Sequence, residues 1–259
     1  MNILDKIIAH KRKEVDALGK QTTFMDLENQ KLFSRKTLSL SGFISDPART
    51  GIIAEFKRRS PSKGVINSEA DIGKVTTGYS GAGASGLSVL TDRKFFNGSL
   101  DDLILTRELN TIPVLRKDFI IHEFQILESK AAGADAILLI AAALSSDQVF
   151  NLAKIAHSLN LEVLLEVHSQ GELEMANEYV NIIGVNNRDL KTFSVNIEVS
   201  VEMADKIPEQ FLKISESGIS SPSTLSYLRE AGYDGFLIGE LFMKREDPVS
   251  AFFEFVKEI

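Results

Sequence analysis

The residues best suited to chemistry in this sequence are lysines and glutamates at the ends of short apolar runs. Glu55 and Lys57 stand two positions apart at the end of one run. In a β-strand their side chains would therefore leave the same face. Lys117 ends another run and precedes Phe119. Apolar surroundings oppose its ammonium state and nearby carboxylates support it, so Lys117 is a candidate proton donor.

Other apolar runs also end in polar or glycine-containing segments. The candidates there are Glu166, Asn186, Arg188, Glu216, Ser217, Gly218, Gly239 and Glu240. Backbone N–H groups beside glycine can approach and hold a phosphate. Each residue alone is more often a surface ion pair or an ordinary turn. Their repetition at the ends of six runs favours one shared site.

The apolar runs themselves predict eight strands. They are residues 51–56, 86–91, 113–116, 134–140, 162–167, 181–186, 211–216 and 235–239. Their near-continuous hydrophobicity is typical of strands covered on both faces, and segments such as 123–132 and 147–159 between them have helical spacing. This alternation predicts an α/β fold, the (β/α)8 TIM barrel, which builds its sites at the carboxyl ends of the strands.

Two glycine-containing patterns need interpretation. AGADAILLI at 132–140 and AGYDGFLIG at 231–239 share an Ala-Gly-x-Asp opening, and both are interpreted as helix-to-strand turns. GAGASG at 81–86 matches the dinucleotide-binding pattern. It follows a helical stretch and precedes a strand, the reverse of what that pattern requires, so it is interpreted as another such turn.

Residues 1–47 are expected to form a helical extension that covers one end of the barrel, within a single domain spanning 1–259. One helical face carries Ile3, Leu4, Ile7, Ile8, Val15 and Leu18. The charged run His10–Lys13 is assigned to the solvated face.

Composition excludes several classes of function. Cysteine is absent, so disulfides and thiolate chemistry are excluded, and the net charge of −7 argues against nucleic-acid binding. No metal or organic cofactor is expected, because the four histidines lack metal-site spacing. His168 alone falls near the candidate site and is interpreted as a bystander. With no apolar stretch of membrane-spanning length, a cytoplasmic protein is expected, either a monomer or a weak oligomer.

The segments that carry these residues resemble the indole-3-glycerol-phosphate synthase family. They are IIAEFKRRSPSKG (52–64), LTDRKFFNGS (90–99), PVLRKDFI (113–120), LLEVH (164–168), GVNNRDL (184–190), SESGI (215–219) and FLIGE (236–240). Together with the opening ILDKIIAHKRKEV they span nearly the whole chain. The resemblance implies conversion of 1-(o-carboxyphenylamino)-1-deoxyribulose 5-phosphate to indole-3-glycerol phosphate, with release of CO2 and water.

The resemblance also implies roles for individual residues. Lys117 matches the general acid of ring closure, Glu166 and Lys57 match groups of the later proton transfers, and Glu55 orients the lysine. Asn186 and Glu216 match positions that bind sugar hydroxyls and shape the charge. The phosphate site of the family is matched by Lys57 and the backbones of Ser217, Gly218, Gly239 and Glu240. Its carboxylate region is matched by Ser60 and Arg188. Its apolar pocket is matched by Phe96, Phe119, Leu138, Leu190 and Ile238.

One departure and two alternatives stand beside this interpretation. Glu240 occupies a position where small residues are common, but only its backbone N–H is needed. Phosphoribosylanthranilate isomerase would call for a catalytic cysteine, which this chain lacks. A non-catalytic sugar-phosphate-binding barrel would keep the glycine turns and lose the acid–base residues.

Overall fold

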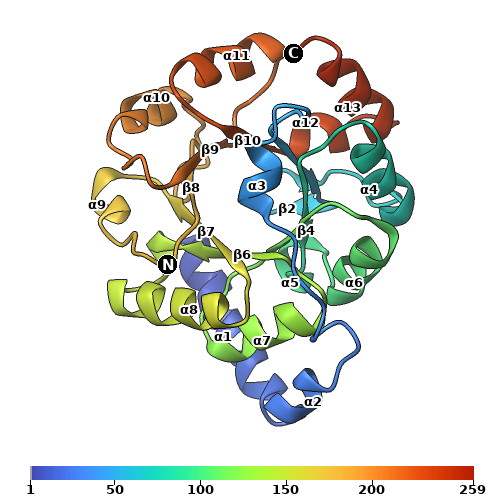
Figure 1. The fold of residues 1–259 in the computed structure, drawn as a ribbon, viewed down its shortest axis with the longest axis vertical. Helices are drawn as coiled ribbons and strands as arrows, with labels where there is room; N and C mark the ends of the chain where they lie inside the picture. Colours follow the sequence, from blue (N-terminus) through green and yellow to red (C-terminus); the bar gives the residue numbers. More distant parts are fainter. Residues whose placement is uncertain (1) are drawn as a thin grey trace.

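The computed structural model describes residues 2–259 and contains a closed barrel of eight parallel strands (Figure 1). In chain order they are β1 (Ile52–Phe56), β4 (Gly86–Leu90), β5 (Val114–Lys117), β6 (Ala136–Ile140), β7 (Glu162–Val167), β8 (Ile182–Asn186), β9 (Leu212–Glu216) and β10 (Gly235–Ile238). β1 pairs with both β4 and β10, which closes the barrel. The predicted TIM barrel is confirmed, and every predicted strand is present.

Helices follow the strands and surround the barrel (Figure 1). The longer ones are α4 (Ile72–Gly81), α6 (Leu100–Leu109), α7 (Glu123–Ala131), α8 (Ser146–Ser158), α10 (Glu198–Ala204), α11 (Pro222–Glu230) and α13 (Pro248–Val256). Shorter elements lie in the connections: β2 (Arg59–Ser60), β3 (Gly64–Val65), α5 (Arg93–Phe96), η1 (Ala141–Ala143), α9 (Gln170–Leu173) and α12 (Glu240–Met243). No helix within residues 2–259 combines the length and apolarity needed to cross a membrane.

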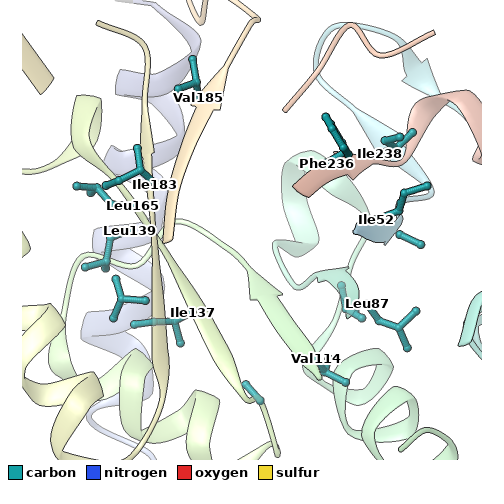
Figure 2. Close-up of a cluster of buried hydrophobic side chains, with 14 of the residues drawn as sticks. Ile52, Leu87, Val114, Ile137, Leu139, Leu165, Ile183, Val185, Phe236 and Ile238 are labelled. Atoms are coloured by element: carbon teal, nitrogen blue, oxygen red, sulfur yellow. The ribbon is translucent and has the colours of Figure 1, made fainter. Parts of the chain in front are cut away.

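The barrel strands bury apolar side chains on both faces. One cluster lies between strands and helices and includes Ile52, Leu139, Ile183 and Phe236 (Figure 2). A second cluster fills the interior of the barrel with alternate residues such as Ile53. Burial on both faces explains why the strand sequences are continuously hydrophobic instead of alternating.

Side chains just before β6, β8 and β10 each fasten that strand to the preceding one. Asp135, Asn181 and Asp234 each accept a hydrogen bond from the backbone N–H of a residue in or beside the preceding strand, at 2.8–2.9 Å. Asp135 and Asp234 are the aspartates of the two Ala-Gly-x-Asp turns, and the glycines there adopt φ of +84° and +99°. The repeated Ala-Gly-x-Asp segment therefore provides both a turn and a side-chain hydrogen bond to the preceding strand, here called a clasp.

The N-terminal segment reaches both ends of the barrel. Helix α3 (Leu40–Ile44) packs Leu40 and Ile44 into the interior cluster. It lies at the amino ends of the strands (Figure 1). There Ser41 donates a hydrogen bond to Glu162 at the start of β7. Helix α1 (Ile3–Leu18) reaches the opposite end, where Ile3, Leu4 and Ile7 line a pocket. Helix α2 (Phe24–Glu28) lies between them in the chain.

The assignment of the whole run His10–Lys13 to solvent is wrong for Lys11, which is only 5% exposed. Its ammonium lies 3.0 Å from Asp92 and 3.0 Å from Asp118, two carboxylates that follow β4 and β5, and 2.7 Å from Glu14. Desolvation opposes this charge, but Asp118 and Asp92 outweigh it and raise the pKa of Lys11. An ionic contact inside the protein therefore fastens α1 to the barrel.

We predict that Lys11→Met destabilises the protein by about 3 kcal/mol, because it leaves the buried Asp92 without its cation and takes one of two cations from Asp118, which keeps Arg116. The matched control is Lys13→Met, a change at an exposed lysine of the same helix, which we expect to cost less than about 0.5 kcal/mol. Urea unfolding of both variants measures the difference. Equal midpoints would show that the buried contact adds nothing to stability.

Candidate active site

One layer of charged side chains closes the barrel interior at the carboxyl ends of the strands. Glu55, Lys117, Glu166 and Glu216 come from β1, β5, β7 and β9, which are alternate strands of the barrel. Alternate strands supply the side chains of each interior layer in this fold. These four side chains line a cavity of about 530 Å³.

Lys117 lies between two of the carboxylates. Its Nζ donates to Glu216 Oε2 at 2.5 Å and to Glu166 Oε2 at 3.1 Å. The lysine side chain is 12% exposed, against 4% for Glu166 and 2% for Glu216. Nearly all of the charge is thus removed from water, while the ammonium keeps an opening toward the cavity.

Burial and the shared Lys117 ammonium give Glu166 and Glu216 different pKa values. Burial raises the pKa of Glu216 to about 7, with repulsion from Glu166 adding to it and Lys117 opposing it. Glu166 is desolvated as well, but Lys117, His168 and Asn186 outweigh this and lower its pKa. Desolvation disfavours the Lys117 ammonium, yet Glu216 and Glu166 together raise its pKa. Carboxyl groups separated in this way can act as acid and base at one pH.

Glu55 and Lys57 form a second lysine–carboxylate pair, in which Lys57 Nζ donates to Glu55 Oε1. Both lie on the face that the two-residue spacing predicts and both line the cavity. Gly239 passes close to this pair, since a Cβ there would lie 2.7 Å from Glu55 Oε1. Glycine is therefore required sterically where β10 ends.

An apolar wall faces the charged layer. Phe96 and Phe119 place their ring centroids 5.9 Å apart. Other residues of this wall include Leu138, Leu190, Ile238 and, from α1, Ile3, Leu4 and Ile7. Asp92 caps α5, which carries Phe96, and Asp118 accepts from the N–H of Phe119. The Lys11 contact thus holds both phenylalanine-bearing segments in place.

Two tight turns form another part of the cavity. Ser217 and Gly218 follow β9 with φ of 65° and 81°, both in the left-handed region. Asn187 stabilises this turn, donating to the Ser217 carbonyl at 3.0 Å and to Ser215 Oγ at 2.9 Å. Gly239 and Glu240 form the second turn at the start of α12. Both turns line the cavity and present main chain that could hold an anion.

Charged side chains from three loops meet at the mouth. Arg188 after β8 donates to Glu240 at 3.4 Å, and Lys63 lies 3.5 Å from the same carboxylate. Ser60 is buried in the loop after β1 and accepts from the N–H of Lys63. In residues 2–259 no three histidine or acidic side chains are grouped closely enough to hold a metal ion.

Every candidate catalytic, substrate-binding and phosphate-binding residue from the sequence lines this one cavity. Sequence reasoning gave no role to Lys11, Asp118 or Asn187. Asp118 lines the cavity, whereas Lys11 and Asn187 lie behind the lining and hold it. His168, interpreted from the sequence as a bystander, stands two residues after Glu166, as Lys57 does after Glu55. The structure places its imidazole 3.6 Å from Glu166.

Comparison with solved structures supports the fold. The chain superposes on 3-hexulose-6-phosphate synthase from Salmonella typhimurium with a TM-score of 0.62 and 12% identity, covering 80% of this chain and 97% of the other. Thiamine phosphate pyrophosphorylase from Pyrococcus furiosus gives a TM-score of 0.59 at 15% identity, covering 83% of this chain and 96% of the other. These identities show a shared barrel and nothing about activity.

Comparison of sequences is more specific. The family model of indole-3-glycerol phosphate synthase matches residues 4–255. An indole-3-glycerol phosphate synthase of Bacteroides thetaiotaomicron is 47% identical, with 100% of this chain and 99% of the relative covered. One of Laribacter hongkongensis is 41% identical, with 96% and 97% covered. This chain belongs to the indole-3-glycerol phosphate synthase family.

Proposed function

We propose that this protein is a carboxy-lyase of tryptophan biosynthesis that converts 1-(o-carboxyphenylamino)-1-deoxyribulose 5-phosphate to indole-3-glycerol phosphate. The observation that carries the proposal is the buried Lys117 ammonium, held between Glu166 and Glu216 and facing an apolar wall across the cavity. The substrate has a flat aromatic ring, a ketone and a phosphate, which match the wall, the ammonium and the glycine turns. The proposed place of action is the cytoplasm.

Ring closure requires a proton donor at the ketone. The aromatic carbon that bears the carboxylate attacks the sugar carbonyl carbon, and the carbonyl electron pair moves to oxygen. Lys117 donates the proton that this oxygen takes up. Glu166 and Glu216 keep Lys117 protonated and aim its Nζ into the cavity, so the donor is charged and in place before the substrate binds.

Decarboxylation and dehydration then complete the product. Loss of CO2 returns the carbon–carbon electron pair to the ring and restores its aromaticity. The new hydroxyl leaves as water when it is protonated and the neighbouring carbon gives up a proton. Lys57, paired with Glu55, supplies the acid for this step, and Glu166, whose low pKa keeps it ionised, supplies the base.

The substrate-binding residues divide by chemistry. Phe96, Phe119, Leu138, Leu190 and Ile238 hold the aromatic ring, with Ser60 and Arg188 near its carboxylate. Lys57 and the main chain of Ser217, Gly218, Gly239 and Glu240 hold the phosphate, and Asn186 contacts a sugar hydroxyl. An apolar slot with a few placed polar groups is the usual form of a small-molecule site.

The direct test is turnover of the carboxyphenylamino-deoxyribulose phosphate by the purified chain, with no added metal or cofactor. The protein contains no tryptophan, so indole fluorescence of the product rises without a protein indole background. Saturable binding with no turnover would support the non-catalytic sugar-phosphate-binding barrel instead. Absence of binding would refute the proposed substrate.

We predict that Lys117→Ala lowers kcat by about 10²- to 10⁴-fold, the usual contribution of a general acid. Substrate affinity, followed by the anthranilate fluorescence of the substrate, is expected to change little. Lys154→Ala, at an exposed lysine of α8, is the matched control. Near-normal turnover by the Lys117 variant would remove it as the acid.

A second prediction concerns the pH dependence of stability. The pKa of Glu216 is raised to about 7 in the folded protein, so the folded state binds this proton more tightly than the unfolded state does. The resulting stabilisation is fully present below the ordinary pKa of a glutamate and is lost as the pH rises through 7. Glu216→Gln removes that loss. The variant is expected to be more stable than wild type at pH 8 by on the order of 1–3 kcal/mol. The gap should shrink toward pH 5; a constant gap in urea unfolding would contradict the assignment.

A third prediction tests the phosphate turn. Gly218→Ala places a Cβ 2.7 Å from Val195 at a φ of +81°, so the turn has to distort. We expect affinity for inorganic phosphate to fall about tenfold, equivalent to ~1.4 kcal/mol. Gly81→Ala, where a Cβ meets nothing within 4 Å, is the control. Equal phosphate inhibition in both variants would place the anion elsewhere.

A further inference from the structure

His168 lies just beyond the end of β7, beside the charged layer but outside the cavity lining. Its side chain is 15% exposed. The two-residue spacing from Glu166 places the imidazole on the same side of the chain as that carboxylate. The mechanism proposed above uses Glu166 as a base and assigns no part to this histidine.

Glu172 on helix α9 fixes one side of the imidazole. Its Oε2 accepts from the backbone N–H of His168 at 2.7 Å and lies 3.3 Å from Nδ1 of the same residue. Ser169 caps the helix and accepts from the N–H of Glu172 at 3.4 Å. The turn from β7 into α9 is therefore closed around the ring, which has little freedom to rotate.

The other ring nitrogen points at Glu166. Nε2 lies 3.6 Å from Glu166 Oε1, beyond ordinary hydrogen-bond distance. It is buried, and none of the groups in residues 2–259 is its hydrogen-bond partner. The second oxygen of Glu166, Oε2, is the one that accepts from Lys117. Glu166 thus has a lysine ammonium on one oxygen and an imidazole on the other.

We propose that His168 is a positioning residue for Glu166: held by Glu172, it carries a second positive charge against the carboxylate and keeps it ionised and directed toward Lys117. This role rests on the proposed function, in which Glu166 is the base of the later proton transfers. Glu172 acts on Glu166 only through His168, since it holds the imidazole and does not line the cavity.

The charges around His168 favour its protonated form. Glu166 of β7 and Glu172 of α9 lie next to it, Glu216 of β9 adds a further negative charge nearby, and the Lys117 ammonium contacts the other oxygen of Glu166. Desolvation opposes the imidazolium, but the three glutamates outweigh it and raise the pKa of His168. In return, the imidazolium lowers the pKa of Glu166. Replacement of His168 by a neutral side chain should therefore raise the pKa of Glu166.

The kinetic test is the pH profile of kcat for His168→Gln, which keeps an amide donor and removes the charge. An opposite charge at this range shifts a carboxyl pKa by about 1 unit or more. We therefore expect the acid limb of the profile to move up by about 1 pH unit. His157→Gln, at an exposed histidine of α8, should leave the profile unmoved. A reduced kcat or lower stability with an unshifted acid limb would overturn the proposal.

A second readout needs no turnover. Imidazole NMR titration of His168 in the wild type and in Glu166→Gln measures the contact from the histidine side. Loss of the Glu166 charge should lower the His168 midpoint by about 1 pH unit, and an unchanged midpoint would overturn the coupling. Wild-type protein without turnover but with a shifted midpoint would refute the proposed reaction while supporting the contact.

Discussion

Burial of charge at one end of the barrel is the constraint on which the rest of the molecule depends. Glu55, Lys117, Glu166 and Glu216 form the last interior layer, above apolar layers that exclude water. Two ammonium groups, those of Lys57 and Lys117, face three carboxyls there. One carboxyl is left in excess, and burial together with repulsion from Glu166 raises the pKa of Glu216. The same imbalance stabilises the lysine charge that ring closure needs.

The pocket wall depends on a second buried charge. Lys11 on α1 contacts Asp92 and Asp118, and these carboxylates also hold the backbone at Phe95 and Phe119. The N-terminal helix therefore contributes apolar side chains to the cavity and stiffens two of its loops. Packing of α3 at the amino ends of the strands leaves the carboxyl ends open to ligand.

The strands and the cavity lining were predictable because each depends on local pattern. Apolar runs bounded by polar residues located strand ends to within two residues, and a closed barrel necessarily gathers those ends in one ring. Lys11 was not predictable, because helical periodicity cannot reveal that a charged position will meet Asp92 and Asp118, some eighty and more residues away in the chain. Asn187 was missed for a similar reason, since its partners become neighbours only when β8 and β9 pair.

The clasps made by Asp135, Asn181 and Asp234 have a consequence for how such a barrel can change. They lock strand alignment at the rim opposite the cavity, through bonds that involve no residue of the reaction. Strand register and reactivity therefore depend on different residues. Loops at the open rim can be exchanged or lengthened while the strand register is preserved, so the barrel can serve as a scaffold for new chemistry.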